Sequence, residues 1–358
     1  MMISAKEQSN RDKGEASIMR FRSSVFLACL WLLFAAPLGA GAQWELSGNP
    51  GGGRITSFAV KGSILFATTR DGGVFLSIDN GATWRSINTG LPAKTACQCV
   101  AVSDANILVG TREHGVFLST NNGGWWKAVN TGLSETQILS LAADGANLFA
   151  GTSRGVFRSG DNGASWTAVD SGLPRDFPAN CLVISNGNLA VGSGGKAFLS
   201  MDNGVSWKAI SSGLPKGAQI FCLAVGETDL FAGTEMNGIF VSMDNGGRWK
   251  PIASKVPETE IHCLLFIGAN LLAGTGGGVD MLFGLGETRR IYHGVGVLLS
   301  MDKGAHWTAI NSGLRLAPNL EGRVAFWIEC LAVNGSFLFA STQEGEVWRF
   351  PLSDLPHK

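Results

Sequence analysis

Tryptophan recurs at a nearly constant interval along most of this 358-residue chain. Successive intervals between the six that set the pattern are 42, 40, 41, 42 and 58 residues. These six are Trp84, Trp126, Trp166, Trp207, Trp249 and Trp307, and Trp44 lies 40 residues before the first. A period in this range indicates an array of similar units, none of which can bury its apolar face alone. The repeat therefore limits the possible folds before any other property of the sequence does.

Each repeat contains four short apolar runs, such as CLAV, NLFAGT, GVFLS and KAVN, separated by glycine-rich turns. The 49 glycines, roughly twice the usual share, supply these turns. No segment shows helical periodicity, and short β-type runs at regular spacing predict strands. Four antiparallel strands per repeat form the blade of a β-propeller. The predicted fold class is therefore all-β, with strands A to D counted outward from the propeller axis.

Seven units can be counted, and the last is incomplete. The A strands are predicted to begin near Ile55, Cys99, Ile138, Cys181, Cys222, Cys263 and Cys330. The seventh unit ends after EVWRF, its C strand, whereas Gln43–Leu46 resembles a D strand that precedes the first unit. We predict that this N-terminal strand completes the last blade and so removes the open sheet edges. The prediction is one seven-bladed propeller over residues 43–352, followed by a tail at 353–358.

Residues 1–42 have the features of a secretory signal peptide. A basic patch at Met19–Arg22 precedes an apolar run over Val25–Leu38 and then Ala40-Gly41-Ala42. Met19 is an alternative start that would give a signal of ordinary length. Cleavage after Ala42 predicts an exported protein, periplasmic or extracellular, with no stable membrane insertion. An uncleaved anchor is the alternative, although Pro37 and the glycines after it shorten the apolar stretch.

Six of the tryptophans end an octet of shared pattern: SIDNGATW, STNNGGWW, SGDNGASW, SMDNGVSW, SMDNGGRW and SMDKGAHW. The acceptor position is held by Asp79, Asn121, Asp161, Asp202, Asp244 and Asp302. A short acceptor can bind the turn's own N–H groups, and the glycine two residues later can take positive φ. One carboxylate per octet is too few for the six to eight oxygens that calcium requires. We therefore predict structural octets, with no metal and no cofactor.

The octet resembles the Asp-box, or bacterial neuraminidase repeat, and the resemblance extends over the whole chain after residue 42. The sequence is similar to seven-bladed Asp-box propellers related to photosystem II assembly factors, and more distantly to sortilin-type propellers. This resemblance implies a propeller with a binding or assembly role. Sialidases and xyloglucanases contain the same box, so the resemblance alone does not assign a function.

Five cysteines occupy one position of the repeat, where Ser57 and Ser140 stand in blades 1 and 3. These are Cys99, Cys181, Cys222, Cys263 and Cys330, and Cys97 is the sixth after residue 42. Side chains related by rotation about the axis do not face one another, as a disulfide requires. Cys97 and Cys99 are expected on one face of a strand, which also disfavours a bond between them. We predict free thiols near the axis, and the lack of paired cysteine motifs disfavours zinc.

Two insertions interrupt the repeat, and both are predicted in loops on the face that carries the B–C and D–A connections. Thr275 to Trp307 takes 32 residues, against 15 from Thr234 to Trp249, so the B–C loop of blade 6 gains 17. The D–A loop entering blade 7 gains nine residues by the same comparison. Loops carry function on rigid scaffolds, although insertions are also tolerated at loop tips. The candidate binding residues are Arg289, Arg290, Tyr292, His293, Arg315, Arg323 and Trp327.

The ordinary B–C loops of this face are basic on one arc and acidic on another. Glu235 and Glu344 form the acidic part. The basic residues, a secondary candidate rim, are Arg70, Arg112, Arg154 and Lys196. Such a rim can dock an anionic partner, whereas scattered solvated charge is the alternative.

The predicted function is an exported, non-catalytic, monomeric propeller that docks a protein or carbohydrate partner on the B–C/D–A face. The formal net charge of zero argues against nucleic-acid binding. A glycoside hydrolase is the alternative, because the residue types of a sialidase are supplied by Arg70, Arg112, Arg154, Tyr292, Glu287 and Asp71. Sialidases have six blades, however, and no catalytic aspartate pair, nucleophile elbow, zinc motif or phosphate loop is found.

Overall fold

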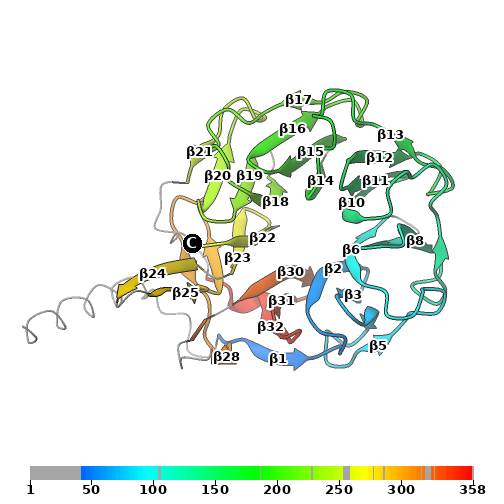
Figure 1. The fold of residues 1–358 in the computed structure, drawn as a ribbon. Coiled ribbons are helices and arrows are strands. Elements are labelled where there is room, and N and C mark those ends of the chain that lie inside the picture. The colour runs from blue at the N-terminus through cyan, green and yellow to red at the C-terminus, as the bar shows by residue number, and fades with distance from the viewer. Residues whose placement is uncertain are drawn as a thin grey trace, which may run out of the picture. The chain divides into compact units, whose positions relative to one another are not determined.

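The structure, a computed structural model, describes residues 42–103, 106–185, 187–226, 229–252, 259–276, 278–284, 287–315, 317–318, 324–325 and 327–356. Seven four-stranded antiparallel sheets stand around one axis, as Figure 1 shows. The prediction of a seven-bladed β-propeller is confirmed. Within the described ranges no helix has the length and apolar character needed to cross a membrane.

The inner strands of the blades form a closed ring, in which each A strand contacts the A strands of both neighbouring blades. These A strands are β2 (Ile55–Lys61), β6 (Cys97–Val102), β10 (Ile138–Asp144), β14 (Cys181–Ser185), β18 (Ile220–Val225), β22 (Ile261–Ile267) and β30 (Ile328–Asn334). The B strands are β3 (Ile64–Thr69), β7 (Ile107–Thr111), β11 (Asn147–Thr152), β15 (Asn188–Ser193), β19 (Leu230–Thr234), β23 (Asn270–Thr275) and β31 (Phe337–Thr342).

The outer half of each blade holds a longer C strand and a very short D strand. The C strands are β4 (Gly73–Ser77), β8 (Val116–Ser119), β12 (Gly155–Ser159), β16 (Lys196–Ser200), β20 (Ile239–Ser242), β26 (Val297–Ser300) and β32 (Val347–Pro351). The D strands of blades 1 to 6 are β5 (Arg85–Ser86), β9 (Lys127–Ala128), β13 (Thr167–Ala168), β17 (Lys208–Ala209), β21 (Lys250–Pro251) and β27 (Thr308–Ala309). A short 3-10 turn, η1 (Leu352–Asp354), follows β32.

The N-terminal strand β1 (Glu45–Gly48) is the D strand of the last blade, as the sequence predicts. It pairs antiparallel with β32, with Glu45 opposite Arg349. Trp44 is 2% exposed, and its indole N–H donates to the carbonyl of Ile310 in blade 6. The two ends of the chain thus share one sheet, which closes the ring.

The tryptophan that ends four of the six octets, and Trp44 likewise, hydrogen-bonds to the preceding blade. The indole of Trp126 donates to the Ile87 carbonyl at 2.6 Å, and that of Trp166 to the Val129 carbonyl at 2.7 Å. Equivalent bonds reach the preceding blade from Trp207, Trp249 and Trp44. Burial of these large rings between blades explains the period of the sequence.

Each octet forms the turn between its C and D strands, around the acceptor side chain. In blade 4 the Asp202 carboxylate accepts from the backbone N–H and the hydroxyl of Ser206 and from the Ser200 hydroxyl. Asn203 and Gly204 follow with φ of 57° and 85°, a left-handed conformation that asparagine and glycine tolerate best. The acceptor side chain thus binds the hydroxyl and N–H groups of its own turn.

Six of the seven A strands begin with a β-bulge. In blade 5, for example, Ile220 lies opposite Thr234 and Cys222 opposite Gly233, so Phe221 is an extra residue. We call these extra residues the bulge residues, and they are Thr56, Gln98, Leu139, Phe221, His262 and Glu329. Bulges re-aim a side chain, and here they do so at the same end of each inner strand.

The bulge corrects one prediction about the cysteines. Cys97 and Cys99 were expected on one face of their strand, but Cys97 packs between blades 1 and 2 and Cys99 between blades 2 and 3. The extra residue Gln98 reverses the alternation between them. All six described cysteines are free thiols, and Cys99, Cys181, Cys222, Cys263 and Cys330 lie opposite a glycine or serine of the B strand.

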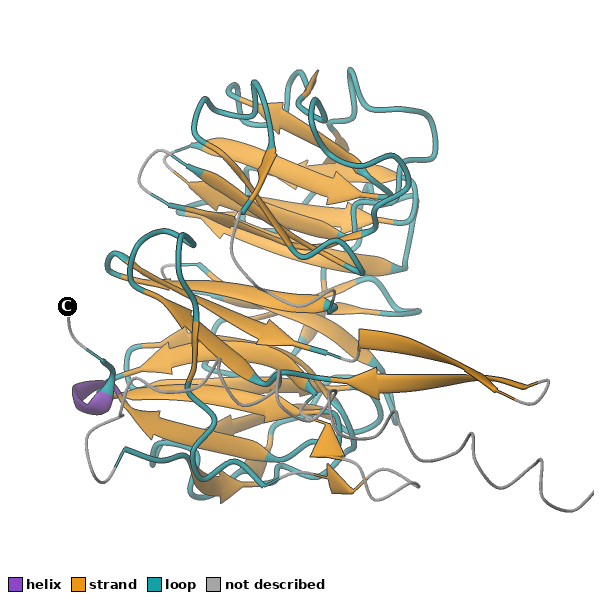
Figure 2. Ribbon diagram, turned by 90° about the vertical axis from the view of Figure 1, so that its left-hand side faces the viewer, coloured by secondary structure: helices purple, strands orange, loops and turns teal. Residues whose placement is uncertain are grey.

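Both insertions add strands outside the blades. β24 (Gly278–Gly284) and β25 (Glu287–His293) pair along their whole length as a two-stranded ribbon. Figure 2 shows this ribbon projecting away from the blades on the side opposite to η1. The second insertion forms β28 (Ala317–Pro318) and β29 (Val324–Ala325), and β25 contacts β29.

Candidate functional site at the mouth of the propeller

A pocket of about 390 Å³ lies on the B–C/D–A face, where the inner strands of blades 7, 1, 2 and 3 begin. Four kinds of position line it: bulge residues, residues just before an A strand, the first residues after a B strand, and the first A-strand residue of blade 2. The lining comprises Arg54, Thr56, Arg70, Ala96, Cys97, Gln98, Arg112, Gln137 and Glu329. We call it the mouth pocket.

The backbone places the arginines of the mouth pocket by one contact repeated in two blades. The Arg70 N–H donates to the Arg54 carbonyl at 2.9 Å, and the Arg112 N–H donates to the Ala96 carbonyl at 3.0 Å. Each bond fixes the start of a B–C loop beside the start of an A strand. Equivalent positions of adjacent blades therefore bring Arg70 and Arg112 to the same pocket.

The three guanidinium groups of the mouth pocket are not equivalent. Arg54 is bound by the carboxylate of Glu329, with 2.5 Å between Nη2 and Oε2. Arg70 and Arg112 are exposed, and neither forms an ion pair with a residue that the structure describes. Two positive charges are thus available to a ligand, beside the amides of Gln98 and Gln137.

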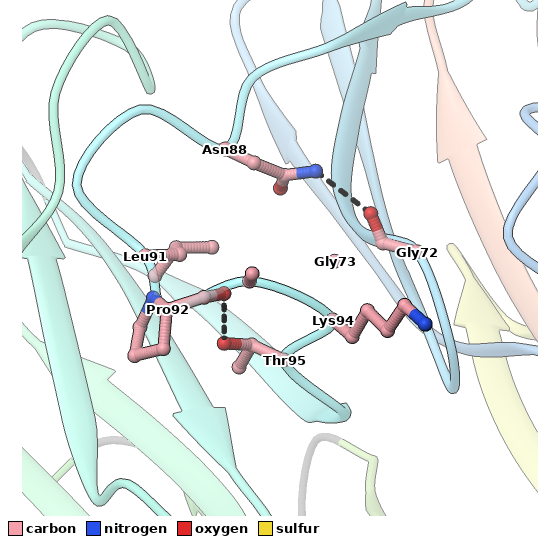
Figure 3. Close-up of a pocket in the computed structure, with 8 residues that line it drawn as sticks. Gly72, Gly73, Asn88, Leu91, Pro92, Lys94 and Thr95 are labelled. Carbon is pink, nitrogen blue, oxygen red and sulfur yellow. Dashed lines mark hydrogen bonds between the residues drawn. The ribbon is translucent and has the colours of Figure 1, made fainter.

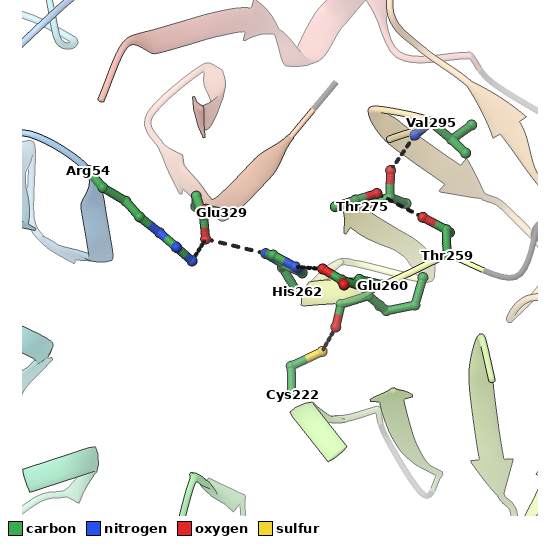
Figure 4. Close-up of polar contacts among 10 residues, drawn as sticks. Arg54, Cys222, Thr259, Glu260, His262, Thr275, Val295 and Glu329 are labelled. Carbon is green, nitrogen blue, oxygen red and sulfur yellow. Dashed lines mark hydrogen bonds and ion pairs between the residues drawn. The ribbon is translucent and has the colours of Figure 1, made fainter. Parts of the chain in front are cut away.

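A buried polar row extends from Arg54 across blades 7 and 6, as Figure 4 shows. Nδ1 of His262 lies 3.3 Å from Oε2 of Glu329, and Nε2 lies 2.9 Å from Oε2 of Glu260. Burial lowers the pKa of His262, but hydrogen bonds and charge from Glu329 and Glu260 outweigh burial and raise it overall. The imidazole is therefore held in place between two carboxylates.

Aromatic rings flank the same imidazole. The ring of Phe221 meets that of His262 edge-on, with centroids 5.5 Å apart and an interplanar angle of 87°. The ring of Trp327 also meets that of His262 edge-on, at 5.5 Å between centroids and 79° between planes. Phe221 is 38% exposed, whereas Trp327 is half-buried. One side of the mouth is therefore cationic and the other aromatic, with Glu329 and His262 between them.

The four residues of the predicted basic rim have different surroundings. Arg70 and Arg112 line the mouth pocket, whereas Arg154 forms ion pairs with Glu135 at 3.3 Å and Asp176 at 3.7 Å. Lys196 begins β16 and is exposed, but it does not line the pocket. Of the four rim residues proposed from the sequence, only Arg70 and Arg112 line the mouth pocket.

The candidate residues of the two insertions occupy different parts of the structure. β25 carries Arg289, Arg290, Tyr292 and His293, and the contact of β25 with β29 brings the two insertions together. Arg315 is exposed in the loop before β28, and Arg323 lies outside the described residues. Trp327 differs from the rest, because it joins the mouth through His262.

Sequence reasoning missed Arg54, Gln98, His262 and Glu329 as site residues. Arg54 stands just before an A strand, whereas Gln98, His262 and Glu329 stand at the bulge, so they belong to two repeat columns on either side of one apolar position. A comparison of these two columns between blades would have revealed polar and aromatic residues where the other inner positions are apolar. The bulge itself has no clear sequence signal, so the side chains' direction could not be predicted.

A second hollow, of about 360 Å³, lies between the B–C turn of blade 1 and the loop entering blade 2 (Figure 3). Asn88 donates to the Gly72 carbonyl at 2.7 Å, and Thr95 donates to the Pro92 carbonyl at 2.6 Å. These polar groups stabilise the loops themselves. Lys94 alone adds charge, so the mouth pocket is the stronger candidate.

The chemistry that the mouth offers is recognition of anions. Glu260 and Glu329 flank an imidazole and bind it from both sides, so the space that a sugar would need between two catalytic carboxylates is filled. The described residues contain no group of three or more metal-binding side chains with suitable geometry.

Comparison with known proteins agrees with this architecture. Residues 52–189 match the DUF6242 beta propeller domain family. No curated protein matches the sequence. Among solved structures, YCF48 from Cyanidioschyzon merolae is 15% identical with a TM-score of 0.64, and the match covers 88% of this chain and 100% of that one.

Two further structures are similar to this chain. YCF48 bound to a D1 peptide is 14% identical with a TM-score of 0.64, and the match covers 89% and 99% of the two chains. The GH74 xyloglucanase from Xanthomonas campestris is 18% identical with a TM-score of 0.63, covering 88% of this chain but 55% of that one. At these identities the similarities establish the fold and leave the function to be argued from the site.

Proposed function

We propose that this propeller is a binding or assembly protein that docks an acidic segment of a protein partner at the mouth pocket. The observation that carries the proposal is the pair of exposed arginines, Arg70 and Arg112, without ion-pair partners among the described residues. Guanidinium groups bind carboxylates through paired, charge-assisted hydrogen bonds. The neighbouring amides of Gln98 and Gln137 add donors for the same ligand.

Four further points support a protein partner. The first is the resemblance to Asp-box propellers of photosystem II assembly factors, and the second is that a structurally similar YCF48 binds a peptide. Backbone hydrogen bonds join the start of the B–C loop to the start of the A strand in blades 1 and 2, so the pocket is formed before a ligand binds. The two inserted strand pairs extend the same face and would enlarge the contact with a protein.

The test is binding of fluorescein-labelled tetraglutamate, measured by fluorescence anisotropy, with tetraglutamine amide as the neutral probe. We expect Arg70→Ala combined with Arg112→Ala to weaken tetraglutamate binding about tenfold or more, because hydrogen bonds to charged groups contribute about 1.5–3 kcal/mol each. Added salt should weaken the wild-type complex as well.

The matched control is Lys127→Ala with Lys208→Ala, which removes the same formal charge from two exposed D-strand positions. This variant should bind tetraglutamate within about twofold of wild type, since distant exposed charges are screened. An equal loss in both double variants would assign the effect to net charge and contradict a site. Absence of wild-type binding would refute the proposal outright.

A glycan is the other class of partner that the sequence left open, and a glycoside hydrolase the other function. Neither has a specific observation in its favour at the mouth, where the two buried carboxylates are occupied by His262 and Arg54. We also propose that the protein acts after export, on the basis of the signal-like residues 1–42.

A further inference from the structure

The bulge residues of the mouth differ in character between blades, and two of them, Leu139 and Phe221, are apolar. Thr56 and Gln98 are polar and line the mouth pocket. Phe221 occupies the equivalent position in blade 5, where it is 38% exposed although it is a large apolar side chain. An aromatic ring exposed at the rim of a central opening, rather than scattered on the outer surface, suggests a contact with a ligand.

The surroundings hold Phe221 in a defined position. Its ring packs edge-on against His262, whose two nitrogens are bound by Glu329 and Glu260. The following residue, Cys222, donates its thiol to the Ile261 carbonyl of blade 6 at 3.5 Å. The ring is therefore presented on fixed neighbours, so little conformational entropy would be lost when a partner covers it.

The same network connects Phe221 to the arginines. Phe221 contacts His262, His262 bonds Glu329, and Glu329 binds Arg54, which lines the mouth pocket with Arg70 and Arg112. A ligand held by its acidic group at Arg70 and Arg112 would have its neighbouring groups over this row. Charge complementarity with the arginines favours an acidic segment as the ligand, and the exposed ring of Phe221 favours a segment that also carries an apolar side chain.

We propose that Phe221, backed by His262 and Trp327, forms an apolar subsite for an aromatic side chain of the partner segment whose acidic group binds Arg70 and Arg112. This inference rests on the proposed docking function and specifies the chemistry of the partner. It accounts for the aromatic residues on one side of the mouth and the cationic residues on the other with a single ligand.

The experiment compares two labelled probes on the full-length chain. Both are tetraglutamate followed by glycine spacers of graded length, and one ends in phenylalanine amide, the other in alanine amide. Wild type should bind the phenylalanine probe about three- to tenfold more tightly at the best spacing, the range expected for one aromatic contact. Wild-type protein thus tests the subsite without any variant.

Phe221→Asn provides the second arm, because blade 4 has Asn180 at the equivalent position. This variant should lose the preference for phenylalanine and bind the alanine probe as wild type does. The control is Trp125→Ser, which removes an aromatic ring that is 58% exposed in the octet turn of blade 2, where blade 3 has Ser165. The control should retain the preference.

The outcomes separate the two proposals. If both probes bind in an arginine-dependent manner without a preference, or if Phe221→Asn keeps the preference, the aromatic subsite is wrong and the docking function stands. If wild type binds neither probe, both proposals are wrong. If phenylalanine is preferred equally after loss of Arg70 and Arg112, the ring binds a ligand of its own and the two-part site is refuted.

Discussion

His262 is a nearly buried histidine that lies between two carboxylates. It is a bulge residue, and its side chain is 10% exposed. Its two ring nitrogens contact Glu260, just before its own strand, and Glu329 of blade 7. The octet aspartates, by contrast, are carboxylates near the surface that accept hydrogen bonds from their own turn. Hydrogen bonds from the hydroxyl and backbone of Ser206, and from Ser200, lower the pKa of Asp202 to about 2, so this carboxylate stays ionised at neutral pH.

We predict that His262 makes stability depend on pH above its ordinary pKa. Because Glu329 and Glu260 raise the folded-state pKa against the effect of burial, its stabilising charge is fully present below about pH 6.5. That contribution is lost as pH rises through the folded pKa. Denaturant unfolding across this range should show wild type losing stability relative to His262→Gln.

The control is His114→Gln, which changes an exposed histidine in the B–C loop of blade 2. Its stability should follow that of wild type over the same pH range. A His262→Gln variant whose unfolding free energy falls in parallel with wild type would mean that His262 titrates alike in the folded and unfolded chain.

At the scale of elements, the sheet of blade 7 depends on a strand from the far end of the chain. The ring of Trp44 packs against that of Phe350 in a tilted arrangement, with centroids 5.4 Å apart, and Glu45 binds Arg349 at 3.2 Å. A strand as short as β1 cannot persist alone, so the buried indole of Trp44 holds it in place.

Trp44→Ala should therefore destabilise the propeller by about 3–5 kcal/mol, the usual cost of removing a large buried aromatic side chain. Leu46→Ala in the same strand is the control, since Leu46 is 50% exposed and its loss should change stability by less than about 0.5 kcal/mol. Urea unfolding of both variants measures the difference. Equal midpoints would show that blade 7 closes without β1.

At the scale of the whole molecule, the closed ring gives the propeller two different faces. The octet turns and η1 lie on one, and the mouth pocket and the insertions lie on the other. Trp44, which precedes the D strand of blade 7, is the second residue after the proposed cleavage site. Ala42 is buried in the same hydrophobic cluster as Trp44. Cleavage after Ala42 would thus remove one small buried side chain and leave the closing tryptophan.

We expect N-terminal sequencing of the exported protein to begin at Gln43, because Ala40-Gly41-Ala42 has the small residues that signal peptidases require. Substituting Ala42 with a bulky residue should block processing, whereas the same change at the exposed Leu46, beyond the site, should not. An uncleaved chain that retains Val25–Leu38 and remains in the membrane would support the anchor instead.

The repeat alone determined the architecture of this protein. Tryptophans near a 41-residue period, turn octets and an unmatched N-terminal strand predict seven blades and their closure, because each of these signals is local and occurs many times. The bulges are different, since one extra residue per A strand depends on pairing with the B strand. That geometry separated Cys97 from Cys99, and it determined which side chains turn toward the mouth.

The candidate site was decided only by the tertiary structure. Arg54, His262 and Glu329 are far apart in sequence, and no two of them belong to the same blade. Ring closure brings blades 6, 7 and 1 together, and only then can one carboxylate contact both a guanidinium and an imidazole. Charge, burial and aromatic contact at the mouth are thus properties of the closed ring, whereas the sequence of any single repeat contains just one part of them.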